Sequence, residues 1–359
     1  MICCAECFSD LEIKVSIESL NHKGECPVCG AKNTWIYDSE LDGENTDFKE
    51  LLASVIGIYK PEEKLDDTFP DDAKRSIEEH LQEDWNIFKV GKEGIRKIAE
   101  GLIQSSADLD EKLLIQKTGI PDLYDEMYLQ RNSIFGKYQW DDFRKYLRNE
   151  NRFHAKYINL GLLSEVLQDT VSIIPKGTSL YRARLAKNEH GYGVGEMGAP
   201  PDDLASAGRA NSKGVSCLYL ANKKETTVKE IRAGAFYYVT IALFQLDKDV
   251  NVVDLSSITH NSPFYAETDK IKFLINERHL RNIERDLAKP LSQRDSDLDY
   301  LPTQYISDFA KYLGYDGVKY ISTFDRNSYN LALFDTKICS CTYRKNYRID
   351  NLDYRLNPV

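Results

Sequence analysis

Four cysteines near the N-terminus have the number and spacing of a metal site. Cys4 and Cys7 form one Cys-x2-Cys pair, and Cys26 and Cys29 form a second pair 18 residues later, a spacing typical of zinc sites. Four thiolates bind tetrahedral Zn²⁺ and leave no open position for a substrate, so the metal would be structural. The sequence therefore predicts a zinc ribbon over residues 1–40. The alternative is four reduced cysteines that hold no metal.

Three regions of the C-terminal half bring together arginines, a carboxylate and hydroxyl groups. Each places polar side chains beside an apolar run or in a glycine-flanked turn, where the backbone can approach a ligand. The regions are 177–184, then 208–214 with 218–221 and 226–230, then 314–322 with 330–334. The sequence contains no dinucleotide-binding glycine fingerprint, P-loop or nucleophile elbow, which disfavours redox use of a dinucleotide and NTP hydrolysis.

In their order and context these regions resemble the RES family, which is named for its Arg, Glu and Ser. Arg182, Glu230 and Ser322 are the matching residues here. The resemblance implies an α+β fold related to ADP-ribosyltransferases and degradation of NAD⁺ by hydrolysis or phosphorolysis. Two departures from the family pattern, Ala210 for an aromatic residue and Ile321 for a proline, concern the detail of the substrate contacts.

Within this resemblance, Glu230 and Arg182 are expected to act on the substrate. Cleavage of the nicotinamide–ribose bond builds positive charge on the ribose, which a fixed carboxylate such as Glu230 would stabilise. The pyrophosphate requires a cation, and arginine offers a planar fork that matches phosphate oxygens. Arg182 ends an apolar strand, with Arg184 on the same side to share this task. Without the flanking regions, Glu230 would be taken for a surface glutamate on a helix.

Arg209, Tyr219 and Ser322 complete the expected site. Arg209 lies in a glycine-flanked turn and would bind pyrophosphate, although a structural ion pair explains it nearly as well. Tyr219 would stack on or hydrogen-bond the nicotinamide ribose, or else pack in the core. Ser322 would act in catalysis by binding phosphate or positioning the attacking water or phosphate, or else occupy an ordinary turn.

A competing pattern lies upstream of the RES-like regions. Arg148 and His154 fit the loose Arg-x4–6-His pattern of HEPN-type helical domains, some of which are ribonucleases. Such a site would need two copies brought together so that His154 acts as acid or base beside an arginine. The alternative is an ordinary histidine in a segment between domains. ADP-ribose transfer to a protein and a non-enzymatic, zinc-dependent interaction role also stay open.

Apolar patterns divide the chain into four parts. We expect a zinc ribbon (1–40), a mostly α-helical, HEPN/RES N-terminal-like domain (41–170), an α+β RES domain (171–345) and a tail (346–359). Alternation over residues 11–17 predicts a strand in the ribbon. Helical spacing predicts helices near 47–61, 93–103 and 140–147, and another that Asp71 and Asp72 would cap.

The RES-like part should alternate short strands with helices. Strands are predicted at 179–181, 217–220, 235–241, 251–255 and 330–334, and helices at 226–232, 264–278 and 304–312. The long stretch between Glu230 and Ser322 predicts an insertion around 261–299, including a polar surface loop over 287–298.

The charge and the apolar content of the chain limit the kinds of binding partner that we expect. A net charge of −10 works against sequence-independent nucleic-acid binding, because clustered lysines and arginines hold a phosphate backbone. The N-terminus lacks the pattern of a signal peptide and no apolar run is long enough for a membrane helix, so we expect a cytoplasmic protein. The expected ligands are NAD⁺ and structural Zn²⁺. The RES resemblance implies a toxin–antitoxin or phage-defence setting, with a separate antitoxin or immunity protein and a homodimer as candidate partners.

Overall fold

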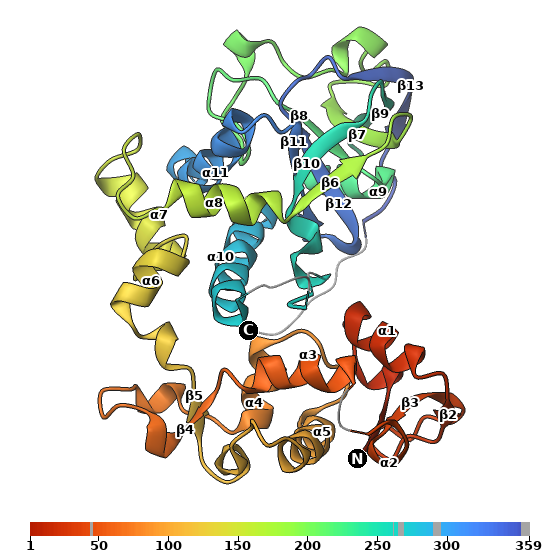
Figure 1. Ribbon diagram of the computed structural model, residues 1–359. Coiled ribbons are helices and arrows are strands. Elements are labelled where there is room, and N and C mark those ends of the chain that lie inside the picture. The colour runs from red at the N-terminus through yellow and green to blue at the C-terminus, as the bar shows by residue number, and fades with distance from the viewer. Residues whose placement is uncertain (44–45, 261, 265–268, 290–295, 353–359) are drawn as a thin grey trace. The chain divides into compact units, whose positions relative to one another are not determined.

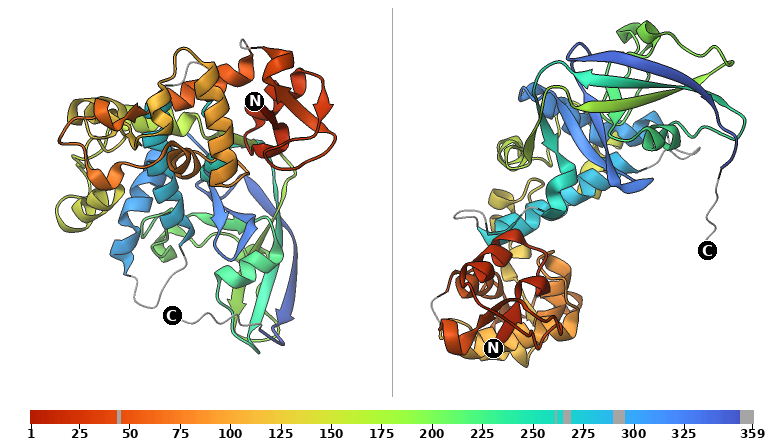
Figure 2. Two further views of the ribbon diagram at one scale, coloured as in Figure 1. Left: turned by 90° about the horizontal axis from the view of Figure 1, so that it is seen from below. Right: turned by 90° about the vertical axis from the view of Figure 1, so that its right-hand side faces the viewer.

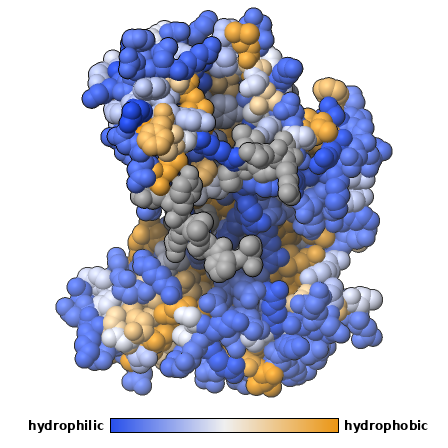
Figure 3. Space-filling view, turned by 180° about the vertical axis from the view of Figure 1, so that it is seen from behind, coloured by the Kyte–Doolittle hydropathy of each residue, from blue (hydrophilic) through white to orange (hydrophobic). Residues whose placement is uncertain are grey.

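The computed structural model describes residues 1–43, 46–260, 262–264, 269–289 and 296–352, and the chain forms two compact units (Figures 1 and 2). Unit 1 comprises Met1–Lys137 and Thr259–Arg278, and unit 2 comprises Tyr138–Ile258 and His279–Val359. These units divide the chain differently from the predicted boundaries at residues 40 and 170. None of the described helices is both long and apolar enough to cross a membrane. The face shown in Figure 3 is mostly hydrophilic, with apolar residues in small separate groups.

Unit 1 consists of helices and two small antiparallel sheets. One sheet has the order β1-β3-β2 (Ile2–Cys4, Thr34–Asp38 and Lys23–Gly24), and the other pairs β4 with β5 (Lys60–Pro61 and Thr118–Gly119). The helices are α1 (Leu11–Ser19), α2 (Ser39–Asp42), α3 (Asp47–Ile56), α4 (Ile77–Asp84), α5 (Lys92–Ser105), α6 (Glu126–Asn132) and the first part of α10 (Lys270–Ala288). The rings of Phe8 and Tyr37 pack on Phe48 of α3, with centroids 5.7 Å and 4.8 Å away. The predicted ribbon therefore shares one apolar core with the helices that follow it.

The segment predicted as a strand, residues 11–17, is helix α1 instead. Asp10 caps the helix, because its carboxylate accepts a hydrogen bond of 3.1 Å from the backbone N–H of Ile13. Ile13 and Ile17 lie one helical turn apart and are fully buried, whereas the other two apolar residues of the run are 61% and 51% exposed. The strand prediction was wrong because a short alternating run also contains the four-residue spacing of a helix.

The predicted helix cap at Asp71 and Asp72 was also wrong. These residues begin a short 3-10 turn, and α4 starts only after Ser76. The backbone N–H of Ser76 donates to the Glu79 carboxylate at 3.2 Å, as in a capping box. The helices predicted near 47–61, 93–103 and 140–147 are confirmed as α3, α5 and α7 (Trp140–Asn149).

A buried polar network in unit 1 is centred on Asp84, the last residue of α4. Its carboxylate accepts hydrogen bonds from Tyr59 Oη (2.9 Å), His80 Nδ1 (3.0 Å) and the Arg278 guanidinium. Trp85 Nε1 in turn donates to Tyr59 Oη at 2.8 Å. Burial alone would raise the pKa of Asp84, but the His80 hydrogen bond and the Arg278 charge outweigh burial and lower its pKa.

We expect Asp84→Asn to destabilise unit 1 in a pH-dependent manner. A carboxyl group with a lowered pKa contributes stability that is present above its unfolded-state pKa of about 3.9 and is lost as the pH falls through the folded-state value. At pH 7 the variant should lose roughly 2–4 kcal/mol of unfolding free energy, because the donors around position 84 lose a buried, ionised acceptor. The difference between the two proteins should shrink as the pH falls from the unfolded-state pKa through the lower folded-state pKa of Asp84.

Urea unfolding followed by tryptophan fluorescence measures this difference at each pH. The control is Asp71→Asn, which removes a carboxylate that is 94% exposed and should leave the unfolding midpoint unchanged. A loss of equal size at pH 3 and pH 7 would contradict the charge-based explanation.

Unit 2 is built on an eight-stranded mixed sheet, which confirms the mixed α/β character predicted for the C-terminal half. The strand order is β13-β9-β7-β8-β12-β11-β10-β6, and of the described pairs only β10 and β11 run parallel. The strands are β6 (Val171–Ile174), β7 (Ser179–Ala186), β8 (Leu218–Ala221), β9 (Tyr238–Leu246), β10 (Val250–Asp254), β11 (Gly317–Ser322), β12 (Asp325–Leu333) and β13 (Cys339–Arg348). All five predicted strands overlap these, whereas β6, β11 and β13 were not predicted.

The helices of unit 2 pack against the middle of this sheet. Helix α9 (Lys224–Glu230) contacts β7 and β8, and α11 (Leu301–Tyr312) contacts β11 and α7 (Figure 1). Helix α8 (Leu160–Gln168) precedes β6. Apolar residues of the central strands, including Leu180, Phe244 and Leu331, form the core. This packing gives the ends of α9, β8, β11 and β12 a fixed mutual arrangement.

The region between β10 and α11 differs from its prediction. Much of the predicted insertion 261–299 is α10, which crosses from unit 1 to unit 2 between Arg278 and His279. Of the predicted loop 287–298, residues 290–295 lie outside the described residues; the described ends are the last turn of α10 and part of a 3-10 turn (Asp297–Tyr300). Strand β13 also continues past the predicted domain end at 345.

Candidate active site and metal site

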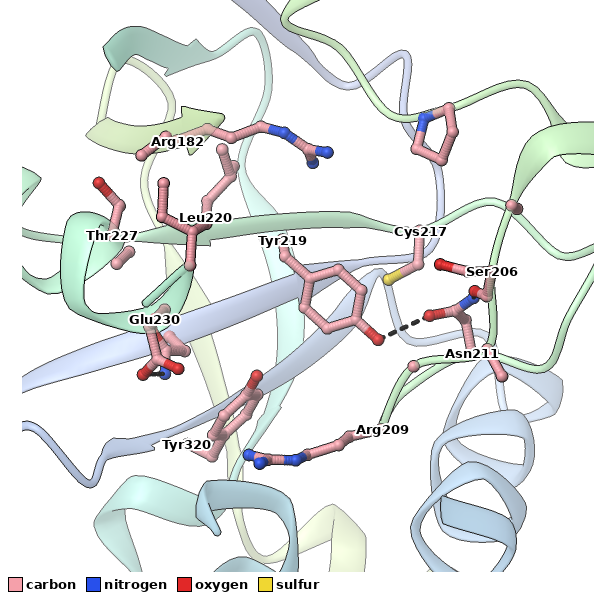
Figure 4. Close-up of a pocket in the computed structure, with 18 of the residues that line it drawn as sticks. Arg182, Ser206, Arg209, Asn211, Cys217, Tyr219, Leu220, Thr227, Glu230 and Tyr320 are labelled. Carbon is pink, nitrogen blue, oxygen red and sulfur yellow. Dashed lines mark hydrogen bonds between the residues drawn. The ribbon is translucent and has the colours of Figure 1, made fainter. Parts of the chain in front are cut away.

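A cavity of about 460 Å³ lies in unit 2 beside the central strands (Figure 4). Its walls come from β7, β8, β11 and β12, the C-terminal end of α9 and the loop 200–211. Arg182, Arg209, Tyr219 and Glu230 line it, so the fold gathers four of the six predicted site residues. Figure 4 shows the guanidinium groups of Arg182 and Arg209 on different sides of the Tyr219 ring.

Glu230 is the last residue of α9 and faces the cavity with an anchored carboxylate. Ser322 Oγ donates a hydrogen bond of 2.9 Å to its Oε1, and Asn330 Nδ2 donates one of 2.7 Å to the same oxygen. No described residue donates to Oε2. The side chain therefore offers one fixed oxygen and one oxygen free for a ligand, as stabilisation of a developing positive charge requires.

Arg182 extends from β7 into the cavity without a protein partner. Its Nε and Nη1 are buried, and neither forms a hydrogen bond within the described chain. Burial, with a smaller effect from Arg184, lowers the pKa of Arg182 to about 10, so the side chain is still a cation at neutral pH. Burying a cation without a partner is costly, which makes Arg182 a strong candidate to bind an anionic ligand.

The turn that carries Arg209 is held by Tyr219. Tyr219 Oη accepts a hydrogen bond of 3.0 Å from the Ala210 N–H and donates one of 2.7 Å to Asn211 Oδ1 (Figure 4). A Cβ on Gly208 would lie 2.5 Å from both of these oxygens, so only glycine fits there. The Tyr219 hydroxyl is thus occupied by the turn, and its ring is the part left to contact a ligand.

Two amide side chains fix the same turn from behind. Asn211 Nδ2 donates to three carbonyl groups, those of Ser206, Ser212 and Val215, at 3.0, 3.2 and 2.9 Å. Gln304 Nε2, from α11, donates to the carbonyls of Gly208 (2.8 Å) and Asn211 (2.9 Å). These bonds satisfy buried polar groups and make the turn rigid.

Arg209 and Tyr320 line the cavity near each other (Figure 4). Arg209 Nη1 donates to the Leu287 carbonyl at 2.7 Å, so part of its guanidinium is already used. Tyr320 is 5% exposed, and burial raises its pKa, which keeps the phenol protonated. Its hydroxyl forms no hydrogen bond within the described residues and can donate one to a ligand.

Two predicted site residues do not line the cavity. The Arg184 guanidinium donates to the Glu196 carbonyl and lies over the Tyr192 ring, 4.3 Å from its centroid. Ser322 is completely buried behind Glu230 and reaches the cavity only through its hydrogen bond to that carboxylate. Direct contact of either side chain with a substrate in the cavity therefore has no support from the geometry.

Sequence reasoning missed four residues that build or line the site: Asn211, Gln304, Tyr320 and Asn330. Tyr320 and Asn330 stand inside the regions that resemble the RES family, so their signal was present but was not interpreted. Asn211 also lies inside one of these regions, 208–214, whereas Gln304 lies outside them and its partners come from a distant segment.

Arg148 and His154 have separate partners in this chain. Arg148 Nη1 forms an ion pair of 2.9 Å with Asp299 Oδ1. The His154 residue is exposed, and only its backbone groups form hydrogen bonds among the described residues, with Asn151 and Tyr146. The geometry of this chain thus gives no support to a ribonuclease site.

The four N-terminal cysteines of the two pairs converge on one point. The Sγ atoms of Cys4, Cys7, Cys26 and Cys29 all lie within 4.8 Å of one another. Three of the separations are 3.7, 3.4 and 3.6 Å, and a tetrahedral zinc with bonds of about 2.3 Å requires about 3.8 Å. Gly30 closes the second pair with φ of 75°, a conformation that favours glycine. The cluster could hold a metal ion, and an all-thiolate donor set suits Zn²⁺.

We expect about one Zn²⁺ per chain, and we expect it to stabilise unit 1. Cys26→Ser combined with Cys29→Ser should lose the metal and lower the unfolding midpoint of unit 1, because the other cysteines of the cluster and Cys26 belong to its core. Cys341→Ser, outside the cluster, should keep the metal. Elemental analysis of protein purified without chelators measures the stoichiometry, and wild-type protein free of zinc would contradict the expectation.

Comparison with known proteins assigns the C-terminal half. Residues 179–357 match the family model described as the RES domain. No curated protein matches the chain. Among solved structures, it is similar to the crystal structure of the MbcT-MbcA toxin–antitoxin complex of M. tuberculosis, with 12% identity and a TM-score of 0.31, over 52% of this chain and 91% of that chain. The matched span contains the whole cavity wall formed by β7, β8, α9, β11 and β12. Residues 179–357 of this chain form a RES domain.

Proposed function

We propose that the RES domain binds NAD⁺ in the cavity of unit 2 and cleaves its nicotinamide–ribose bond. One observation carries the proposal: the cavity pairs an anchored carboxylate, Glu230, with a buried guanidinium, Arg182, that has no partner in the described chain. A substrate with a cationic reacting sugar and an anionic pyrophosphate matches these two groups. The resemblance to the RES family supports the same substrate.

Glu230 would act at the reacting carbon. When the bond breaks, its electron pair leaves with the nicotinamide nitrogen, and positive charge develops on the ribose ring. The free Oε2 of Glu230 would stabilise that charge at the wall of the cavity. Water would then add to the ribose carbon and lose a proton to give ADP-ribose, whereas phosphate would give ADP-ribose 1″-phosphate.

The remaining cavity residues would bind the dinucleotide. Arg182 would hold the pyrophosphate with its unused donors, and Arg209 would add a second, partly used cation. The Tyr219 ring would stack against the nicotinamide or its ribose, and Tyr320 would donate a hydrogen bond. This division of roles follows from which polar atoms the protein leaves without a partner.

The wider role follows from the RES resemblance. Depletion of NAD⁺ would make the chain a toxin or a defence effector, with an antitoxin or immunity protein encoded as a separate chain. A fold related to the ADP-ribosyltransferases is part of the same proposal. The cysteine cluster of unit 1 would hold a structural Zn²⁺ and would take no part in the chemistry.

A product analysis tests the proposal. Purified protein is incubated with NAD⁺, with and without phosphate, and the products are separated by mass. Release of nicotinamide is expected, and the second product distinguishes water, phosphate and a protein side chain as acceptor. No nicotinamide under any condition would reject the proposal, and cleavage of added RNA in the same samples would instead favour the ribonuclease alternative.

A further inference from the structure

Among the described residues, hydrogen bonds hold the Glu230 carboxylate from one side only. Both of its hydrogen-bond donors, Ser322 Oγ and Asn330 Nδ2, reach Oε1, at 2.9 and 2.7 Å. A carboxylate that accepts two bonds on one oxygen has a fixed plane, and its second oxygen points in a fixed direction. The orientation of Oε2 thus depends on where these two donors stand.

Asn330 is the more rigid donor. It lies in β12 and is 6% exposed. Its backbone is in register with Tyr320 of β11 on one side and with Ala221 of β8 on the other. Ser322, in contrast, sits at the register shift at the end of β11, and its Oγ also accepts a hydrogen bond of 3.2 Å from the Phe324 N–H. A position paired on both sides has little freedom to move.

The two donors also differ in chemistry. The Asn330 amide carries no charge and cannot take up a proton at any relevant pH, so it stabilises the ionised form of Glu230 without competing for its proton. The Ser322 hydroxyl is buried, and besides the Glu230 carboxylate it bonds only the Phe324 N–H among the described residues. Asn330 also lines the cavity, but its amide N–H₂ group donates to Glu230.

We propose that Asn330 is the positioning residue of the site, which with Ser322 holds the Glu230 carboxylate turned so that Oε2 meets the substrate. This inference rests on the proposed function for its catalytic consequence, but the Asn330–Glu230 pairing itself does not depend on the substrate. It also assigns Ser322 a positioning role in place of direct contact with phosphate or water.

The variant Asn330→Asp tests the pairing with almost no change of shape. It places a second carboxylate against Glu230, and two carboxylates at that distance resist ionising together. We expect kcat at neutral pH to fall roughly 10–100-fold and KM to change by less than about 3-fold, because the loss falls on the transition state. The pH of half-maximal activity on the acid side should rise by more than about one unit.

The matched control is Asn327→Asp, which makes the same charge change on the same strand. Asn327 is exposed and lies outside the cavity, so its variant should keep the wild-type kcat and pH profile. The other charged or titratable groups near Glu230 are unchanged in both variants, so their effects cancel: Arg209, Arg232, Tyr320, Lys229 and Glu284.

A readout without substrate separates this inference from the proposed function. In protein labelled with ¹³C-glutamate, the Glu230 resonance is identified by its loss in Glu230→Gln, and its titration is followed by NMR. The pH at the midpoint of the Glu230 titration should rise in Asn330→Asp and should be unchanged in Asn327→Asp. Should Asn330→Asp fail to fold, Asn330→Ala gives the same sign, because the ionised form loses a donor.

A Glu230 titration that is unchanged in the folded variants would overturn the inference, even if NAD⁺ is cleaved. Wild-type protein that releases no nicotinamide would reject the proposed function, and the titration would still decide whether Asn330 controls Glu230. A normal titration shift with an unchanged kcat would also overturn the catalytic part of the inference.

Discussion

Glu230→Gln should lower kcat for NAD⁺ cleavage by roughly 10²–10³-fold, with little change in KM. Glutamine keeps the size of the side chain and an oxygen that can accept the bonds from Ser322 and Asn330, at 2.9 and 2.7 Å. The substitution therefore removes the negative charge and leaves the geometry of the site. Since the charge acts mainly when the ribose becomes cationic, the loss should appear in turnover rather than in binding.

Steady-state kinetics of nicotinamide release measure this effect. The control is Glu225→Gln, on the same helix, where the carboxylate is exposed and forms a surface ion pair with Lys224; its kcat should equal that of the wild type. Normal turnover by Glu230→Gln would remove the carboxylate from the mechanism and end the present assignment of the site.

Arg182→Lys should lower kcat/KM by roughly 10–100-fold, because a lysine point charge cannot reproduce two directed hydrogen bonds to phosphate oxygens. Both bonds are available in the wild type, since Nε and Nη1 of Arg182 are buried without a partner in the described chain. The loss should be visible in the affinity for NAD⁺ measured by calorimetry. The control is Arg184→Lys, two residues further along β7 and outside the cavity. This variant should bind NAD⁺ as the wild type does.

Stability measurements distinguish a ligand-binding arginine from a structural one. A buried cation without a partner destabilises the folded state, so Arg182→Met should unfold at a higher temperature than the wild type although it is inactive. If Arg182→Met were less stable than the wild type, the guanidinium would instead be part of the structural framework. If Arg182→Lys bound NAD⁺ normally, the pyrophosphate would have to lie elsewhere.

Local sequence was sufficient for much of the site because its key residues belong to regular elements: Glu230 and Ser322 end theirs, whereas Arg182, expected at the end of a strand, lies within β7. Arg182, Glu230 and Ser322 were found from short regions of strand and helix pattern, and Arg182 and Glu230 meet at one cavity. The cysteine pairs also predicted a four-cysteine cluster, because the spacing within and between the pairs allows four sulfur atoms to approach one point. Glycine at 208 could be noticed from the sequence, but its close contacts with Tyr219 and Asn211 could not.

Other features depended on partners far away in the sequence. The alternating run 11–17 became a helix because Asp10 caps it and two of its apolar residues meet the core of unit 1. Arg184 is also an arginine, and it lies on the same face of β7 as Arg182. The Glu196 carbonyl and the Tyr192 ring nevertheless hold the Arg184 guanidinium away from the cavity. Neither outcome follows from spacing alone, because several packings satisfy the same pattern.

The sequence by itself determined the residue types for the chemistry, the cysteine set for a metal and the mixed α/β character of the C-terminal half, because these are properties of composition and short-range periodicity. Only the tertiary structure decided which polar groups are already satisfied. Tyr219 Oη is occupied by Ala210 and Asn211, and Glu230 Oε1 by Ser322 and Asn330, whereas Arg182 has buried donors without a partner in the described chain. A hydrogen bond is short and directional, so the distinction between a structural polar group and one that can bind substrate exists only when distant strands have been brought into register.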